Sequence, residues 1–187
     1  LKSMKDVIDQ MKKDPGSVKW GGGSRGSTEH IAAAMIAREV GVDPSKINYV
    51  PFRGGGEATA AILGGNVTVG GSGYRDFKEY IQSGKMRAIG VTSPTRLKGV
   101  NVPTLKEQGI NVELGNWRGV YGAPGISADQ RKALTGMVLK AVKSKAWAEA
   151  LEKNKWTPAV MAGAEFDEFV DREFAGLRAT MVKAGMI

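Results

Sequence analysis

Apolar residues in the first part of the chain recur at two spacings, and each spacing predicts a different element. The first apolar positions have helical spacing and are Met4, Val7, Ile8 and Met11. Ser3 stands where an N-cap belongs, and Asp6 stands where a carboxylate faces the first helical amides. Asp14-Pro15-Gly16 follows, and a turn of this composition ends a helix. The chain is therefore expected to begin with a short amphipathic helix.

After this helix the chain repeats one order three times: a short β-like run, a glycine-rich turn and a helix. The β-like runs are residues 17–20, 47–52 and 67–69, and the helices after the turns cover about 28–40, 57–63 and 74–82. A fourth β-like run covers residues 86–91. Strands joined by helical crossovers are parallel, and their carboxyl ends meet at one edge of the sheet. The order predicts an α/β fold with a mostly parallel sheet, whose glycine turns share the edge where such sheets bind ligands.

The second part of the chain is predicted to be extended at first and then helical. Residues 112–123 have the composition of an extended crossing strand that is interrupted at residues 116–119. Ser127 and Gln130 have the spacing of a capping box, so a helix is expected to begin after Ser127. Its expected buried stripe consists of Leu134, Met137, Val138, Ala141 and Val142. Further helices are expected at about 146–153 and 165–184, and their bulky apolar faces need a partner.

The first glycine turn has the anatomy of an anion-binding site. The stretch from Trp20 to His30 holds four glycines and three hydroxyl-bearing residues, and a strong helix-forming run follows it. The first amides of a helix lack internal partners and lie at the positive end of its dipole, so they can bind a carboxylate or phosphate. Such a turn can equally be a tight connection without a ligand, with Ser27 or Thr28 as N-cap. The two companion turns on the same sheet edge favour a binding site.

The candidate ligand-binding residues combine exposed backbone, hydroxyl groups and two arginines. They are Gly23, Ser24, Arg25, Gly26, Ser27, Thr28, Arg53, Gly71, Ser72 and Gly73. Either arginine can supply charge to an anionic ligand, although a loop arginine is more often simply solvated. His30 is expected to pack or cap near the first turn of the helix that begins here.

Charge and composition narrow the function classes. The chain has 187 residues, enough for one well-buried domain or for one domain and part of another. Lys and Arg number 27 and Asp and Glu 19, so the net charge is 27 − 19 = +8. The basic residues are dispersed, and no basic block alternates with aromatic residues as a nucleic-acid groove requires. We expect no nucleic-acid partner, and an anionic small ligand suits the charge.

Catalytic and metal chemistry have few residues to draw on. The chain has no cysteine and one histidine, so neither a thiolate metal site nor a Ser-His-Asp triad is expected. Glu57 and Asp76 follow the second and third turns, where they complement the helix dipole. We predict no catalysis, no cofactor and no metal, and keep an α/β enzyme acting on a phosphorylated or acyl anionic substrate as the alternative. No stretch approaches the roughly 20 apolar residues of a membrane span.

Several blocks, in their order along the chain, carry a resemblance to a known family. The blocks are residues 20–30, 50–55 (VPFRGG), 61–67 (AILGGNV), 84–93 (GKMRAIGVTS), 102–105 (VPTL) and 117–119 (WRG). Together they resemble the substrate-binding proteins of tripartite tricarboxylate transporters, the Bug-type receptors. The resemblance implies a type II periplasmic-binding-protein fold with two lobes that close on a small carboxylate. It also implies a periplasmic location and delivery of the ligand to the membrane permease subunits, without catalysis.

The resemblance implies a division of the chain. Residues 1–115 would be the second α/β lobe, residues 112–125 the segment that crosses the hinge, and residues 126–187 helices that pack on the first lobe. By the same resemblance, the first lobe would lie outside these 187 residues. The chain alone should then expose a large apolar patch or self-associate through its C-terminal helices, and it should not bind its ligand tightly.

The resemblance also assigns roles within the turns. Residues 24–28 would donate amides and a hydroxyl to a ligand carboxylate, and residues 71–73 would form a second contact. Arg25 replaces a residue that is commonly small or an amide, and Ser72 stands where an aspartate is frequent. A more electropositive rim favours a di- or tricarboxylate over an amino acid. Our hypothesis is an organic acid held mostly by the amides of Gly26, Ser27 and Thr28.

Overall fold

The computed structural model describes residues 1–187 and divides them into two compact units. The first unit comprises Leu1–Asn116 and Phe174–Ile187, and the second comprises Trp117–Glu173. The division at Trp117 falls inside the segment 112–125 that was expected to cross a hinge. None of the helices combines the length and the apolar character that crossing a bilayer requires.

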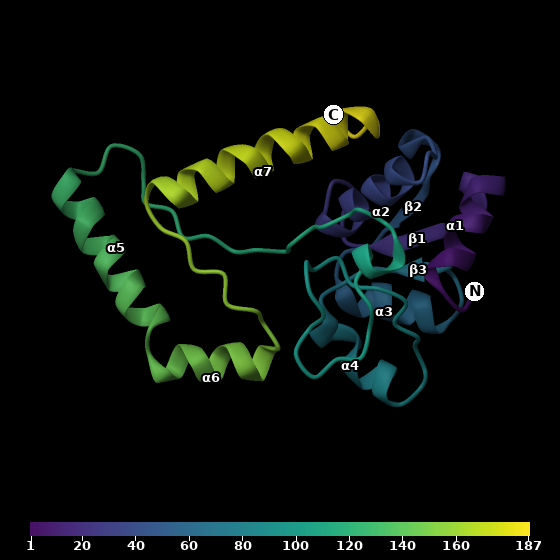
Figure 1. Ribbon diagram of the computed structural model, residues 1–187, viewed down its shortest axis with the longest axis horizontal. Coiled ribbons are helices and arrows are strands. Elements are labelled where there is room, and N and C mark those ends of the chain that lie inside the picture. Colours follow the sequence, from purple (N-terminus) through teal and green to yellow (C-terminus); the bar gives the residue numbers. More distant parts are fainter. The chain divides into compact units, whose positions relative to one another are not determined.

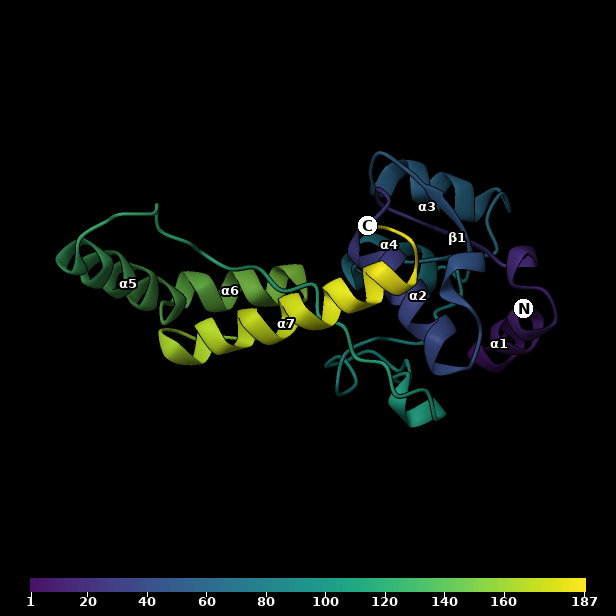
Figure 2. The ribbon, with the colours of Figure 1, turned by 90° about the horizontal axis from the view of Figure 1, so that it is seen from above.

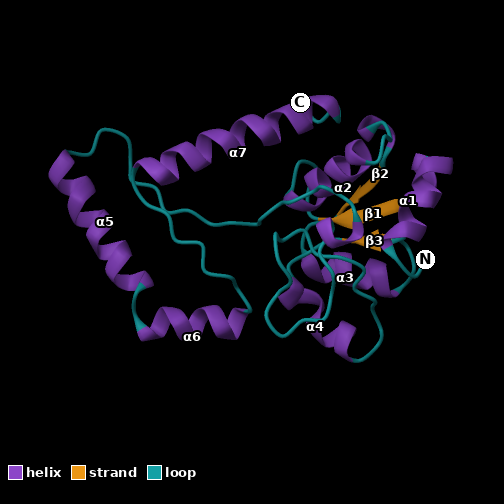
Figure 3. Ribbon diagram, in the orientation of Figure 1, coloured by secondary structure: helices purple, strands orange, loops and turns teal.

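The first unit is built on a small parallel sheet, drawn in orange in Figure 3. Its strands are β1 (Lys19–Gly22), β2 (Asn48–Pro51) and β3 (Val69–Gly70), in the order β2-β1-β3. Both pairings are parallel, and Trp20 of β1 lies opposite Tyr49 on one side and Val69 on the other. The predicted parallel sheet is therefore present, and the structure places β1 at its centre.

Four helices surround the sheet: α1 (Met4–Lys13), α2 (Thr28–Glu39), α3 (Gly55–Leu63) and α4 (Tyr74–Gln82). All four were expected, although α3 begins two residues before the predicted start at residue 57, because Gly54 serves as its N-cap. Figures 1 and 2 show α2 and α3 on opposite sides of β1. The strand pleat accounts for this arrangement, since successive residues point to opposite faces.

The main core lies where α1 and α2 cover one face of the sheet. Its buried residues are Met4, Val7, Met11, Val18, Trp20, Ala33, Ile36, Ala37, Val42, Tyr49, Leu105, Ile110 and Val112. The stripe predicted for the first helix supplies Met4, Val7 and Met11 to this core. A capping box starts the same helix: Ser3 Oγ accepts from the Asp6 amide at 3.2 Å, and Asp6 Oδ2 accepts from the Ser3 amide at 3.1 Å.

The fourth predicted strand, residues 86–91, is not a strand. Only Val91 pairs, in an isolated parallel bridge to Thr104. The side chain of Gln108 donates to the Ile89 carbonyl at 3.0 Å, so this carbonyl is satisfied by a side chain and not by a neighbouring strand. Leu105 also crowds the run, because a Cβ on Gly90 would lie 2.9 Å from its Cδ2. A β-branched composition alone does not supply a pairing partner.

The run at residues 112–123 is also irregular, whereas an extended strand was expected there. Its first part is held by loop contacts: the Leu114 amide donates to the Thr92 carbonyl at 3.0 Å, and Thr92 Oγ1 donates to the Leu114 carbonyl at 2.7 Å. Because these contacts tie the segment to another loop, it forms no ladder.

The second unit contains α5 (Ala128–Val142), α6 (Lys145–Asn154) and the first part of α7 (Ala164–Lys183), labelled in Figure 1. The predicted capping box starts α5, with Ser127 Oγ accepting from the Gln130 amide at 3.2 Å. In a small aromatic cluster, the ring centroid of Trp117 lies 6.1 Å from that of Phe166 and 5.3 Å from that of Phe169. The Trp117 indole also donates to Glu173 Oε2 at 3.3 Å.

The apolar stripe predicted to be buried on α5 is not buried. Leu134 is 47% exposed and Met137 is 67% exposed, and neither α5 nor α6 has a buried residue. On α7 the only buried residue is Thr180. The amphipathic pattern is correct as a helix signal, but within the second unit it leaves Leu134 and Met137 exposed.

The core makes a direct prediction for Met11, whose side chain is fully buried. Replacing Met11 with alanine should lower the free energy of unfolding by about 2–5 kcal/mol, because contacts are lost and a cavity is left. Urea unfolding followed by circular dichroism measures this loss. Lys12→Ala, on the exposed side of the same helix, should change the free energy by less than about 0.5 kcal/mol. Similar losses in both variants would contradict the assigned core.

Candidate functional site

The three glycine-rich turns lie at one edge of the sheet, as predicted. The first turn joins β1 to α2, the second joins β2 to α3, and the third joins β3 to α4. Because all three strands are parallel, the amino ends of α2, α3 and α4 follow the same carboxyl edge. We call this edge the glycine rim and define it by residues 22–29, 53–57 and 71–76.

Some backbone amides of the first turn already have hydrogen-bond partners nearby in the chain. The Gly26 amide donates to Nδ1 of His30 at 3.0 Å, and the Ser27 amide donates to the Ser24 carbonyl at 3.0 Å. Gly26 has φ +79°, a conformation that suits glycine. The Thr28 amide has no partner in the chain, and its hydroxyl lies 3.5 Å from Asn116 Oδ1. Of the three amides expected to face a ligand, only that of Thr28 remains available.

Tyr49 of β2 fixes the shape of this turn. Its hydroxyl donates to the Gly23 carbonyl at 2.9 Å and lies 3.2 Å from Ser27 Oγ, which can donate to it in turn. Ser27 is the N-cap residue of α2, yet its side chain makes no cap hydrogen bond because it faces Tyr49. Burial raises the pKa of the Tyr49 phenol, so it stays a donor at neutral pH.

His30 packs against the same tyrosine, with ring centroids 4.1 Å apart and planes 22° from parallel. It is 5% exposed, which agrees with the expectation that it packs near the start of the helix. Burial and then the positive charge of Arg25 lower the pKa of His30. A neutral ring with the proton on Nε2 leaves Nδ1 free to accept from Gly26, so His30 holds the turn only while it is uncharged.

Glu29 lies between the first and third turns, and the sequence analysis did not single it out. A Cβ placed on Gly22 would lie 2.6 Å from the Glu29 Cβ, and one on Gly71 would lie 3.2 Å from it. Glu29 Oε2 lies 3.2 Å from the Cβ position of Gly23. The absence of side chains in both turns therefore lets a half-buried carboxylate sit between them.

Asp76 joins the second and third turns in a similar way. Ser72 Oγ donates to Asp76 Oδ2 at 2.5 Å, and this oxygen lies 3.9 Å from the Cβ position of Gly55 and 3.8 Å from that of Gly73. The Gly71 amide is used within the sheet, where it donates to the Gly21 carbonyl at 2.9 Å. The third turn thus offers a hydroxyl–carboxylate pair to the rim.

The two candidate arginines are exposed and form no ion pair within the chain. The Arg53 amide donates to Glu57 Oε2 at 3.0 Å, which anchors the second turn, while the Arg53 side chain is left to solvent. The structure shows no group of three or more His, Cys, Asp or Glu side chains placed to hold a metal ion.

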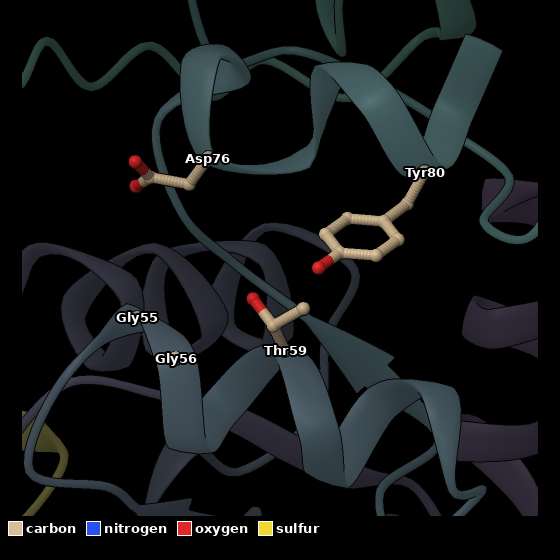
Figure 4. Close-up of a pocket in the computed structure, with 5 residues that line it drawn as sticks. All are labelled: Gly55, Gly56, Thr59, Asp76 and Tyr80. Atoms are coloured by element: carbon tan, nitrogen blue, oxygen red, sulfur yellow. The ribbon is translucent and has the colours of Figure 1, made fainter. Parts of the chain in front are cut away.

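An open pocket of about 470 Å³ lies beside the rim, between α3 and α4. It is lined by Gly55, Gly56, Thr59, Asp76 and Tyr80. Figure 4 shows the hydroxyls of Thr59 and Tyr80 directed into the space between the two helices. Sequence analysis placed Gly55 in the second turn, Asp76 after the third turn and Tyr80 on the inward face of its helix. It did not predict that Thr59 and Tyr80 line a pocket, because this depends on how the helices pack.

The end of α7 also borders the first turn. The methyl carbon of Met181 lies 3.4 Å from the Cβ position of Gly26, and Arg38 Nη1 donates to Thr180 Oγ1 at 3.4 Å. Thr180 is 2% exposed. The last residues of the chain thus pack on the turn and on α2, within the first unit.

Comparison with known proteins identifies the family. The sequence profile of the tripartite tricarboxylate transporter family receptors matches residues 1–186. The chain belongs to this family. The resemblance carried by the blocks of sequence is therefore confirmed.

Relatives from curated proteins align over almost the whole chain. Protein BugT of Bordetella pertussis is 28% identical over 175 residues, which are 92% of this chain and 53% of BugT. A UPF0065 protein of Cupriavidus necator is 25% identical over 187 residues, which are 100% of this chain and 56% of that protein. The chain thus spans about half the length of these curated relatives.

Solved structures show the same fold. A TctC solute-binding protein from Polaromonas has a TM-score of 0.78 and 29% identity, covering 98% of this chain and 62% of that protein. Rpa4515 of R. palustris, solved with adipate, has a TM-score of 0.81 and 22% identity, covering 99% of this chain and 62% of that protein. These likenesses confirm the α/β, periplasmic-binding-protein-like fold class.

His30 predicts how stability depends on pH. Its pKa is lowered in the folded state, so the unfolded chain binds more protons as the pH falls through the ordinary histidine value of about 6.5. The free energy of unfolding should therefore be highest above pH 6.5 and should fall as the pH drops toward the folded pKa.

Urea unfolding at several pH values between 7 and 5 measures this dependence. Because His30 is the only histidine in the chain, His30→Gln should flatten the curve in that window. The same pH dependence in the wild type and in His30→Gln would show that the buried ring does not carry the effect.

Proposed function

We propose that this chain forms part of a periplasmic receptor that binds a small organic carboxylate at the glycine rim and delivers it to a membrane permease. The observation that carries the proposal is the convergence of three helix amino ends, with the open Thr28 amide and hydroxyl, at one edge of a sheet. Membership of the tricarboxylate transporter receptor family supports it. The presence of adipate in the Rpa4515 structure supports a carboxylate as the ligand class.

Four features of the rim and of the chain suit an anionic ligand. The Thr28 amide lies at the positive end of the α2 dipole, where a carboxylate is stabilised. Arg25 and Arg53 are exposed and can pair with further carboxylates of a di- or tricarboxylate. Gly23 to Thr28 and Gly71 to Gly73 form the two contact segments, with Ser24, Ser27 and Ser72 as their hydroxyls. The net charge of +8 attracts such a ligand at long range.

The two-lobed arrangement is part of the same proposal. Residues 1–115 would form one α/β lobe, residues 112–125 would cross to the other lobe, and helices within residues 126–187 would pack on that other lobe. The exposed Leu134 and Met137 of α5 support this division. The end of α7 is an exception, since Thr180 is already buried within the first unit.

One observation favours the enzyme alternative. The 2.5 Å contact between Ser72 Oγ and Asp76 Oδ2 brings a hydroxyl and a base together, as acyl or phosphoryl transfer would need. A hydrogen bond between these two positions at the start of a helix explains the same geometry without catalysis. The only histidine, His30, is already in use, because it accepts from the Gly26 amide and stacks on Tyr49. Ser72→Ala distinguishes the two functions: a receptor loses only affinity, whereas an enzyme loses turnover.

Calorimetry on the complete gene product that contains these residues tests the ligand class. Adipate, citrate and malate should bind, whereas glutamate should bind more weakly and neutral amino acids should not bind. The physical reason is the pairing of several carboxylates with the rim donors and the two arginines. Binding of only neutral or cationic compounds would contradict the proposal.

A matched pair of variants locates the site in the same experiment. Thr28→Val should weaken adipate binding about tenfold, because a hydrogen bond to a charged group is lost. Thr95→Val, at an exposed position away from the rim, should leave the affinity unchanged. Equal affinities in the two variants would show that the carboxylate does not contact the Thr28 hydroxyl.

The exposed helix faces predict self-association of the 187-residue chain. Light scattering should show an average molecular mass that rises with protein concentration. Association lowers the free energy because it buries apolar faces that are otherwise exposed to water. Met137→Lys, at a position 67% exposed, should shift the chain toward monomer without lowering its unfolding midpoint. A chain that stays monomeric at high concentration and binds no hydrophobic dye would contradict the expectation.

A further inference from the structure

The hydroxyl of Ser27 is diverted from the place that an N-cap side chain usually takes. Ser27 precedes α2, and an N-cap serine normally accepts a hydrogen bond from an amide of the first helical turn. Here the side chain makes no cap bond and lies 3.2 Å from the Tyr49 hydroxyl. Because Tyr49 donates its proton to the Gly23 carbonyl at 2.9 Å, Ser27 donates to Tyr49. A strand residue therefore competes with the helix for its capping group.

This diversion leaves the first amides of α2 open. The first main-chain bond of the helix runs from the Ile31 amide to the Ser27 carbonyl at 3.0 Å. The amides of Thr28, Glu29 and His30 precede this bond, and the N-cap side chain accepts from none of them.

The three other helices with a serine N-cap differ from α2. The N-cap serines of α1, α5 and α6 each accept from an amide in the first turn of their helix. The uncapped start of α2 is therefore not a general property of serine in this chain. It follows from the position of Tyr49, which takes the serine hydroxyl at the glycine rim.

His30 holds the other side of the same turn. Its Nδ1 accepts from the Gly26 amide at 3.0 Å, and its ring stacks on Tyr49 with centroids 4.1 Å apart. A protonated ring carries a hydrogen on Nδ1 and would present a donor to the Gly26 donor. The contact with Gly26 therefore requires a neutral ring, and protonation would release the turn.

The groups around this ring favour its neutral form. The ring is 5% exposed, and burial followed by the positive charge of Arg25 lowers the pKa of His30. The Tyr49 phenol faces the ring from β2 and stays neutral, because burial and then the charge of Glu29 raise its pKa. From α7, the uncharged side chain of Met181 borders the turn. The open turn and the neutral ring therefore occur together.

We propose that Tyr49 and His30 are positioning residues of the ligand site. Tyr49 keeps the Ser27 hydroxyl away from the α2 amides, so that a ligand carboxylate can accept from them. His30 holds Gly26 in place, and only its neutral form does so. The inference rests on the proposed function and narrows it, because Ser27 then acts through Tyr49 and not by contact with the carboxylate.

Calorimetry with adipate on the complete gene product tests the role of Tyr49. Tyr49→Phe keeps the ring and its stack on His30 but frees Ser27, which can then cap α2 and compete with the carboxylate. The affinity at pH 7.5 should fall about tenfold. The double variant Tyr49→Phe/Ser27→Ala removes the competing hydroxyl and should restore most of the affinity.

A matched variant and the rescue separate positioning from stability. Tyr121→Phe, at a position 63% exposed, should leave the affinity unchanged. If Tyr49 served stability alone, the double variant would bind no better than Tyr49→Phe. Absence of rescue, or an unchanged affinity in Tyr49→Phe, would overturn the role of Tyr49.

The pH dependence tests the role of His30 separately. In the 187-residue chain, ¹⁵N nuclear magnetic resonance should show the Gly26 amide shifting with the same midpoint as the His30 ring, below the ordinary histidine value of about 6.5. In the complete gene product, the apparent dissociation constant for adipate should be constant above this midpoint. Below it the constant should rise toward about tenfold per pH unit, because only the neutral fraction binds.

His30→Gln is the control for the pH series. Its amide oxygen can still accept from Gly26, and the titration of adipate itself is the same in both proteins. The variant should therefore lose only the dependence that the ring contributes. Equal pH dependence in the wild type and in His30→Gln would overturn the role of His30.

Failure of the positioning roles is distinct from failure of the proposed function. Adipate binding that is indifferent to Tyr49→Phe and to the His30 proton would overturn the positioning roles and leave the receptor proposal standing. Absence of binding by adipate, citrate and malate in the wild type at every pH would overturn the proposed function, and the positioning roles with it.

Discussion

Helices approach the strand ends of this protein so closely that only glycine fits there, and this constraint shapes the site. A Cβ on Gly22 would lie 2.6 Å from Glu29 of α2, and a Cβ on Gly70 would lie 2.0 Å from Ile62 of α3. The closeness places helix starts, with their free amides, directly at the carboxyl edge of the sheet. The same bare backbone leaves room for the carboxylates of Glu29 and Asp76 between the turns.

Positive and negative groups lie close to one another along the glycine rim. Donors come from the starts of α2 and α3, and acceptors come from Glu29 and Asp76, while Arg25 and Arg53 remain exposed. A uniformly positive rim would attract any anion, whereas an alternating rim recognises the arrangement of donors and acceptors on a ligand. For this reason we assign the ligand class to the geometry of the whole rim and not to the net charge.

Much of the fold could be predicted because its signals are local. The four helices of the first unit, the capping boxes at Ser3 and Ser127, and the three parallel strands follow from spacing and turn composition. The prediction of a strand at 86–91 was wrong because strand pairing depends on a partner that is distant in the sequence. In the structure the Gln108 side chain donates to the Ile89 carbonyl instead. The prediction that the apolar stripe of α5 is buried was wrong for a related reason. An amphipathic pattern cannot reveal whether this chain contains the surface that covers it.

The candidate site was predicted in outline only. The glycines and hydroxyls of the turns could be found because they follow the strands directly in sequence. Tyr49, Thr59 and Tyr80 could not, because each reaches the site from the body of a strand or helix, where its residue type suits ordinary packing equally well. The use of the Gly26 and Ser27 amides within the turn was likewise invisible, since it depends on how His30 and Ser24 face them.

The central claim is that the glycine rim holds a carboxylate, and a crystal structure of the complete gene product with adipate tests it most directly. The account predicts a carboxylate oxygen within about 3 Å of the Thr28 amide or hydroxyl, with a second contact at residues 71–73. Adipate bound without contact to either of these turns would contradict it.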